Sequence, residues 1–392
     1  MVASFDQNAY VHRLSDLTRV DSFPTAARVT SALRVGERVL TTSQDGTTRS
    51  WDRRGPVIHR QGEPVYQLSV DRQHTVLSAV GVGPDVVSLF DLSGEDPRPL
   101  PSPEAPPGET LWYAGAVAPD ASLVAGGTED GDVLVWPLDG GRPEEPERAA
   151  AIEAGITGAD VTTDAGTIAA WSEVGSEIAL LRRGPDAPLR RVATIPVPGT
   201  EAARFDADGT LFAAADDTNG VELWDVSDPA APRRAAGLAL DSVATSIAFS
   251  PVADLLAVGT EAGRVRLWDV ADPSDPHPVG ETSDALSSVK GLQFSADGTL
   301  LAGASGDKFV WMWTVGAADL DVYAALSASG DRMNDVRFVG DRLVATGDDG
   351  VVRSWLVRAE DAVEAVCANR GDPITEDEWR RHVTGAPYRD LC

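Results

Sequence analysis

The sequence predicts an all-β protein, a β-propeller of four-stranded blades, on three observations. A short β-rich run that ends at an anchor residue recurs every 39 to 46 residues along the chain. Two further strand-like runs precede each anchor, and turn sequences rich in Gly, Asp and Asn separate them at matching places. A repeat of this length with several short strands per unit is typical of propeller blades.

The repeat is defined by the residue that anchors the third strand of each unit. There are eight anchors, and at the fourth the aromatic ring is lost: Trp51, Phe90, Trp136, Leu180, Trp224, Trp268, Trp313 and Trp355. Large apolar side chains at a fixed place in a strand are expected to pack between neighbouring blades. The anchors therefore predict eight structural units.

The inner layout of a unit is clearest between residues 241 and 283. Alternating residues 243–249 predict a first strand, and the apolar run 255–260 predicts a buried second strand. Glycine at position 263 favours a hairpin turn into a third strand at 264–269. A proline-rich link follows, and residues 279–281 can supply a short fourth strand.

Closure of the ring decides the number of blades. We expect eight blades within residues 1–358, with residues 17–23 acting as the fourth strand of the last blade, so that no sheet edge stays open. Residues 9–16 also resemble a third strand, which leaves the alternative of seven closed blades and one spare unit, as in a remnant of a longer array. Residues 359–392 are expected to form a helical tail, because 359–367 have helical spacing and 375–378 form a capping box.

Several motifs resemble the WD40 family: Leu-Trp-Asp-Val at 223–226 and 267–270, Ala-Phe-Ser-Pro at 248–251, and Gln-Phe-Ser-Ala-Asp-Gly at 293–298. The proline-rich connectors at 226–232 and 270–276, together with the tail, are similar to WD40 regions of actinobacterial signalling proteins that carry a STAND-type NTPase. The Gly-His pair that usually opens a WD40 repeat is absent, so the family's Asp-His-Ser/Thr-Trp network cannot be complete. Cys367 and Cys392 match cysteines in those tails; the alternatives are a disulfide or, in a reducing cytoplasm, two free thiols.

Charge narrows the range of partners. With 33 basic and 61 acidic residues the net charge is −28, which disfavours nucleic acid and anionic membrane surfaces. The composition also fits a high-GC genome with an acidic proteome, so the charge identifies no partner. No run reaches the roughly 18 apolar residues of a membrane span, and the start lacks the pattern of a signal peptide, so we expect a cytoplasmic protein.

A search for chemistry finds no catalytic, cofactor or metal residues. The five histidines fall at different phases of the repeat, and the phosphate-binding glycine motifs are missing. The acidic runs at 206–209 and 216–217 fit inter-strand turns better than a calcium loop. Propeller enzymes of the quinoprotein or lactonase type are the less favoured alternative, since the starts of the first strands are mostly small or apolar and no repeated carboxylate or histidine points inward.

The sequence thus favours a non-enzymatic, monomeric scaffold or sensor that binds other proteins and needs no cofactor. Its binding face is expected where the connectors enter the first strands, and the candidate contacts are Leu111, Trp112, Ser288 and Arg332. The alternative function is that of a regulatory remnant or partner of a STAND-type NTPase, which the resemblance implies.

Overall fold

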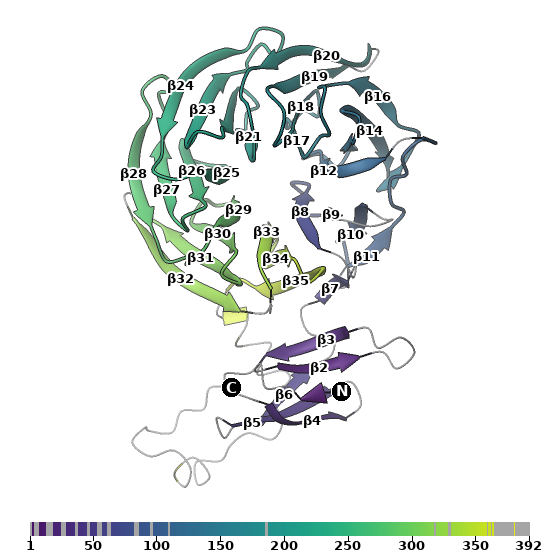
Figure 1. Ribbon diagram of the computed structural model, residues 1–392, viewed down its shortest axis with the longest axis vertical. Helices are drawn as coiled ribbons and strands as arrows, with labels where there is room; N and C mark the ends of the chain where they lie inside the picture. Colours follow the sequence, from purple (N-terminus) through teal and green to yellow (C-terminus); the bar gives the residue numbers. More distant parts are fainter. Residues whose placement is uncertain are drawn as a thin grey trace.

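The fold is a ring of four-stranded sheets, seen in a computed structural model (Figure 1). The structure describes residues 2–3, 8–12, 19–24, 29–35, 38–44, 48–52, 57–60, 64–81, 86–94, 97–108, 110–184, 187–316, 319–327 and 331–358, together with residues 360, 361, 363 and 380. Seven sheets form the ring, each running from an inner first strand to an outer fourth strand. The predicted propeller of four-stranded blades is confirmed.

The strands of the ring follow one order in every blade. The first strands surround the centre: β8 (Val65–Val70), β12 (Leu111–Val117), β17 (Gly158–Val161), β21 (Ala203–Phe205), β25 (Ala244–Phe249), β29 (Val289–Phe294) and β33 (Met333–Val339). The second strands are β9 (Val76–Gly81), β13 (Leu123–Thr128), β18 (Thr167–Trp171), β22 (Leu211–Ala215), β26 (Leu255–Thr260), β30 (Leu300–Ser305) and β34 (Arg342–Gly347).

The outer half of each blade completes the sheet. The third strands are β10 (Val87–Asp91), β14 (Asp132–Asp139), β19 (Ile178–Gly184), β23 (Gly220–Asp225), β27 (Val265–Asp269), β31 (Phe309–Val315) and β35 (Val351–Leu356). The fourth strands are β11 (Arg98–Leu100), β16 (Glu147–Ala150), β20 (Ala187–Ile195), β24 (Arg233–Ala239), β28 (His277–Thr282), β32 (Leu320–Ser327) and β7 (Val57–Arg60), while the short β15 (Arg142–Pro143) pairs with the end of β14. All these pairings are antiparallel, which lets short hairpin turns connect the strands.

The apolar cores lie between neighbouring blades. One cluster joins Val135 of the second blade to Ile168 and Leu181 of the third. The second strands are almost entirely buried because both of their faces pack against adjacent sheets. Six anchors are buried in such clusters, namely Phe90, Trp136, Leu180, Trp224, Trp268 and Trp313, and Trp355 is partly buried; the side chain of Trp51 lies outside the described residues.

The expectation of eight blades is wrong, and the described residues show the alternative, seven closed blades. The unit that contains Trp51 forms a separate three-stranded sheet of β4 (Val29–Val35), β5 (Arg38–Ser43) and β6 (Thr48–Asp52). A second such sheet contains β1 (Val2–Ala3), β2 (Asn8–His12) and β3 (Arg19–Pro24), and both lie outside the ring (Figure 1). The unit around Trp51 has the local sequence of a blade, but it is not part of the ring.

The ring is closed by β7, which pairs with β35 of the last blade. Closure by residues 17–23 is therefore wrong, since β3 covers most of that segment and pairs with β2 instead. Ile58 of β7 packs against a cluster that joins Val344 and Val352 of the last blade to Leu68 of the first. Although β7 follows the Trp51 unit in the sequence, it forms the fourth strand of the last blade.

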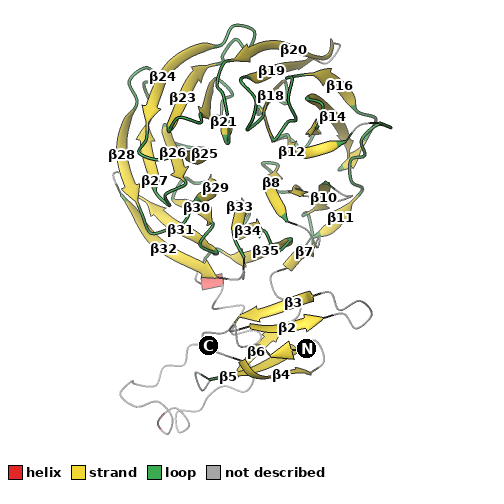
Figure 2. Cartoon of the chain, viewed as in Figure 1, coloured by secondary structure: helices red, strands yellow, loops and turns green. Residues whose placement is uncertain are grey.

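The predicted helical tail falls mostly outside the described residues. Glu360, Asp361, Val363 and Arg380 are helical, and the short helical segment beside the last blade is the red element of Figure 2. Cys367 and Cys392 lie outside the described residues, so the state of these two thiols stays a prediction.

Candidate functional site

The ring has two faces that differ in which turns they carry. We call entry face the side with the links that enter the first strands and with the turns between second and third strands. The opposite exit face carries the turns between first and second strands and the links into fourth strands. This assignment follows from the antiparallel order within each blade.

Three exposed apolar side chains lie on the entry face. Val174, in the turn between β18 and β19, is 86% exposed, and Leu286, in the link before β29, is 88% exposed. Tyr66 at the start of β8 is also exposed. These side chains come from the third blade, the link into the sixth blade and the first blade, and an exposed apolar side chain can take part in contact with a partner.

The residues predicted as contacts lie at corresponding places on this face. Ser288 and Arg332 each precede a first strand, and their backbone carbonyls accept hydrogen bonds from Gly306 N at 2.9 Å and Asp348 N at 3.0 Å. Their side chains are half-buried and exposed, respectively, and Leu111 is half-buried. The side chain of Trp112 lies outside the described residues. The structure adds Leu286 and Val174, which the sequence analysis did not select.

A group of carboxylates also lies on the entry face. Glu173, Glu201 and Glu261 come from three successive blades, in the turn after β18, the link before β21 and the turn after β26. Burial raises the pKa of Glu201 above its ordinary value, and the negative charges of Glu173 and Glu261 raise it further, while Lys290 lowers it. Three carboxylates and one lysine therefore share this part of the entry face, where a further cation would complement the excess negative charge.

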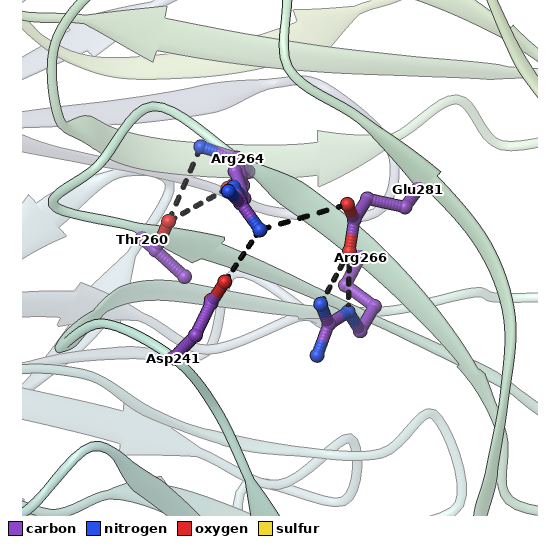
Figure 3. A network of polar contacts seen from close by, with 5 residues as sticks. All are labelled: Asp241, Thr260, Arg264, Arg266 and Glu281. Atoms are coloured by element: carbon purple, nitrogen blue, oxygen red, sulfur yellow. Dashed lines mark hydrogen bonds and ion pairs between the residues drawn. The ribbon is translucent and has the colours of Figure 1, made fainter.

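Around β27, in contrast to this group of carboxylates, acidic and basic side chains form ion pairs with one another (Figure 3). Arg264 pairs with Asp241 of the preceding link and lies 3.8 Å from Glu281 of β28, measured from Nη1 to Oε1. Arg266 Nε donates to Glu281 Oε2 at 2.7 Å. Thr260 Oγ1 accepts from the backbone N–H of Arg264 at 3.2 Å. These exposed pairs contribute little stability, but they keep the two guanidinium groups engaged.

Seven side chains that were not predicted from the sequence surround the centre of the propeller. One position near the end of each first strand lines an inner cavity of about 250 Å³; its seven occupants are Ser69, Ala116, Asp160, Arg204, Ala248, Gln293 and Arg337. Several of them connect blades. Ser69 Oγ accepts from Val117 N at 3.0 Å, and Asp160 Oδ2 accepts from Phe205 N at 2.8 Å.

The charges in this cavity come from different blades. Arg337 is buried and its Nη1 donates to Asp335 Oδ1 at 2.6 Å, while Asp335 Oδ2 accepts from Leu68 N at 2.8 Å. Burial raises the pKa of Asp160, although Arg204 and the Phe205 N–H act in the opposite direction. The inner cavity, which we call the channel, is therefore lined by charged side chains near the ends of the first strands. The sequence-based expectation of a small or apolar lining concerned the starts of these strands.

Neither a metal-binding cluster nor a membrane-spanning helix occurs in the described part of the chain. That part of the chain contains no group of three or more His, Cys, Asp or Glu side chains placed to hold a metal ion. It also contains no helix that is long and apolar enough to cross a membrane.

Comparison with known proteins agrees with this architecture. Residues 240–269 and 278–314 match the family model described as WD domain, G-beta repeat. The fold is similar to a chain of the solved structure "Crystal Structure of Mitotic Checkpoint Complex", with a TM-score of 0.64 and 15% identity over 77% of this chain and 93% of that chain. At that identity the similarity shows the fold alone. The search of curated proteins finds no match. Two segments of the chain, in the fifth and sixth blades, match the WD40 repeat, and the fold is a β-propeller.

Proposed function

We propose that this propeller is a non-catalytic scaffold whose entry face binds another protein. The observation that carries the proposal is the exposure of Val174 and Leu286 on one face, beside the carboxylates of Glu173, Glu201 and Glu261. WD40 propellers generally act by binding proteins, and a rigid ring with loops that differ between blades suits that role. The proposal places the interaction in the cytoplasm and needs no cofactor.

The chemistry of the face favours a particular kind of partner segment. A basic side chain would relieve the repulsion between Glu201 and its acidic neighbours, and apolar side chains on either side would cover Val174 and Leu286. We therefore propose a partner segment with Lys or Arg between apolar residues. Such a contact would be weakened by salt, because part of it is electrostatic.

Two valines on opposite faces provide the test. Val174→Asp is expected to weaken capture of the partner from native cells by about 10-fold or more, because it places a charge in the centre of the apolar contact. The matched control is Val252→Asp, since Val252 is also exposed but lies on the exit face in the turn between β25 and β26. Quantitative mass spectrometry of captured proteins gives the ratio. Equal capture by both variants would contradict the assignment of the entry face.

The nature of the partner can be tested in the same experiment. The resemblance of the proline-rich connectors to actinobacterial signalling proteins supports a STAND-type NTPase as the partner class. Recovery of such an NTPase with the unaltered propeller, and its loss with Val174→Asp, is the expected result if the chain regulates that class of enzyme. Specific recovery of unrelated proteins instead would favour a general scaffold.

A further inference from the structure

The inner cavity of the ring contains cationic groups that the protein-binding proposal does not use. Arg204 and Arg337 project into it from β21 and β33, which lie on different sides of the centre (Figure 1). Their mutual repulsion contributes to the lowered pKa of Arg337, after burial as the main cause. Two guanidinium groups that face one cavity repel each other unless negative charge compensates them.

Three carboxylates lie near these arginines, and each also accepts hydrogen bonds from backbone N–H groups; Asp206, which lines the cavity, accepts them from its own turn. Asp335 forms an ion pair with Arg337 and also accepts from the backbone at Leu68. Asp160 accepts from Phe205 N, and among the described residues it forms no ion pair with either arginine. Burial raises the pKa of Asp160, while the positive charge of Arg204 and the hydrogen bond from Phe205 N act against that rise.

Donor groups remain available on both arginines. Within the described part of the chain, Arg204 makes one hydrogen bond, from Nη1 to Ala203 O at 2.8 Å, and no ion pair. Arg337 uses Nη1 for both of its hydrogen bonds, to Asp335 and to Val336 O at 2.6 Å. Each guanidinium therefore keeps free N–H groups of the geometry that binds carboxylate and phosphate oxygens in a bidentate manner.

A third arginine lies at the exit-face mouth of the cavity. Arg72, in the turn after β8, donates from Nη2 to Thr163 Oγ1 and to Ala207 O, both at 3.1 Å. These acceptors belong to the third and fourth blades, so the side chain reaches across the channel. It lines both the inner cavity and a wider hollow of about 920 Å³ on the exit face. An anion that enters from this side would meet Arg72 before the two inner arginines.

We infer that the exit end of the channel binds a small oxyanion, a phosphate or carboxylate group, between Arg204 and Arg337 with Arg72 at the mouth. The inner cavity of about 250 Å³ is below the roughly 300 to 1,000 Å³ of sites for drug-sized ligands. It suits a single anionic group, with any larger remainder of the ligand in the outer hollow. The overall charge of −28 opposes the approach of anions, although salt screens distant charges over about 8 Å. The outer hollow is also lined by Asp71, Asp164 and Asp208, so the anion would be held by the free N–H groups of the inner arginines.

Isothermal titration of the full chain with inorganic phosphate, and separately with acetate, tests this inference at constant ionic strength set with chloride. Saturable binding of one equivalent of at least one of the two probes is expected, and the preferred probe identifies the oxyanion. Arg204→Gln should weaken that binding by about 10-fold or more, because it removes a charge-assisted contact. The control is Arg233→Gln, which alters an exposed arginine on the outer strand β24 and should leave the affinity unchanged.

Absence of saturable binding for both probes would overturn the inference, as would equal affinity in Arg204→Gln and the unaltered chain. If Arg204→Gln does not fold, Arg72→Gln replaces it, since Arg72 is exposed at the mouth and its loss should weaken phosphate or acetate binding by about 3-fold or more. Unchanged affinity in Arg72→Gln would then contradict the site. Neither outcome depends on whether the entry face binds a protein.

Discussion

A chain that begins at residue 64, and so lacks β7, is expected to unfold at a clearly lower urea concentration than a chain that begins at residue 53. The first chain loses the three residue pairs between β7 and β35 and the cover that Ile58 gives to the cluster between the last and first blades. At about 1 kcal/mol for each lost hydrogen bond and at least as much for the apolar contact, we expect a destabilisation of about 3 to 5 kcal/mol.

The matched chain that begins at residue 53 controls for the loss of the first two sheets. It lacks β1 to β6 but retains β7, and its unfolding midpoint should remain close to that of the full chain. The chain without β7 should also aggregate more readily, since β35 becomes an open sheet edge. Equal midpoints for the two truncated chains would show that β7 does not close the ring.

Trp313→Ala is expected to destabilise the protein by about 3 to 5 kcal/mol, the range found when a buried aromatic side chain is removed. The Trp313 side chain is fully buried between the fifth and sixth blades, and its Nε1 donates to Asp284 Oδ2 at 3.1 Å. Asp284 also accepts from Thr282, so the link between two blades depends on this group. Urea unfolding followed by circular dichroism measures the change.

A comparison of two anchors separates packing from hydrogen bonding. Trp313→Phe leaves Asp284 without its indole donor, whereas the Nε1 of Trp268 is buried with no hydrogen-bond partner among the described residues. Trp268→Phe therefore removes an unsatisfied donor along with the lost volume. We expect Trp313→Phe to cost about 1 kcal/mol more than Trp268→Phe. A larger cost at Trp268 would contradict the role assigned to Asp284.

The boundaries of the second and third strands within a blade were predicted accurately from the sequence. The second strand expected at residues 255–260 is β26, and the third strand expected at 264–269 differs from β27 by one residue. Apolar periodicity and turn chemistry are local signals, and both are strong here. The fourth strand β28 is longer than expected because it begins at His277 and includes Pro278, which an outer strand tolerates since one edge needs no donor.

The number of blades depended on a choice that local sequence does not encode. The unit from β4 to β6 resembles a blade in its strands and anchor, and β7 follows it where a fourth strand belongs. Either β6 or β35 could offer β7 an antiparallel edge. Closure of the ring and packing of Ile58 between the last and first blades select β35.

The charged cavity was missed because its residues do not repeat. Asp160, Arg204 and Arg337 occupy the same position of different first strands, but other blades have Ala, Ser or Gln there. A signal that repeats within the chain was present in the neighbouring residue, since Phe205, Phe249, Phe294 and Phe338 each follow the lining position. Comparison of the residues before these phenylalanines would have brought the arginines together.

The pairing of β7 with β35 is the central structural claim, and an engineered disulfide tests it most directly. Arg60 and Val351 are paired across these strands, so Arg60→Cys with Val351→Cys, in a chain where Cys367 and Cys392 are replaced by Ser, should form an intramolecular disulfide on mild oxidation. The rival pair Val20→Cys with Val351→Cys should remain reduced, because β3 pairs with β2. Mass spectrometry that finds the Val20 bridge and no Arg60 bridge would contradict the seven-bladed ring and restore closure by residues 17–23.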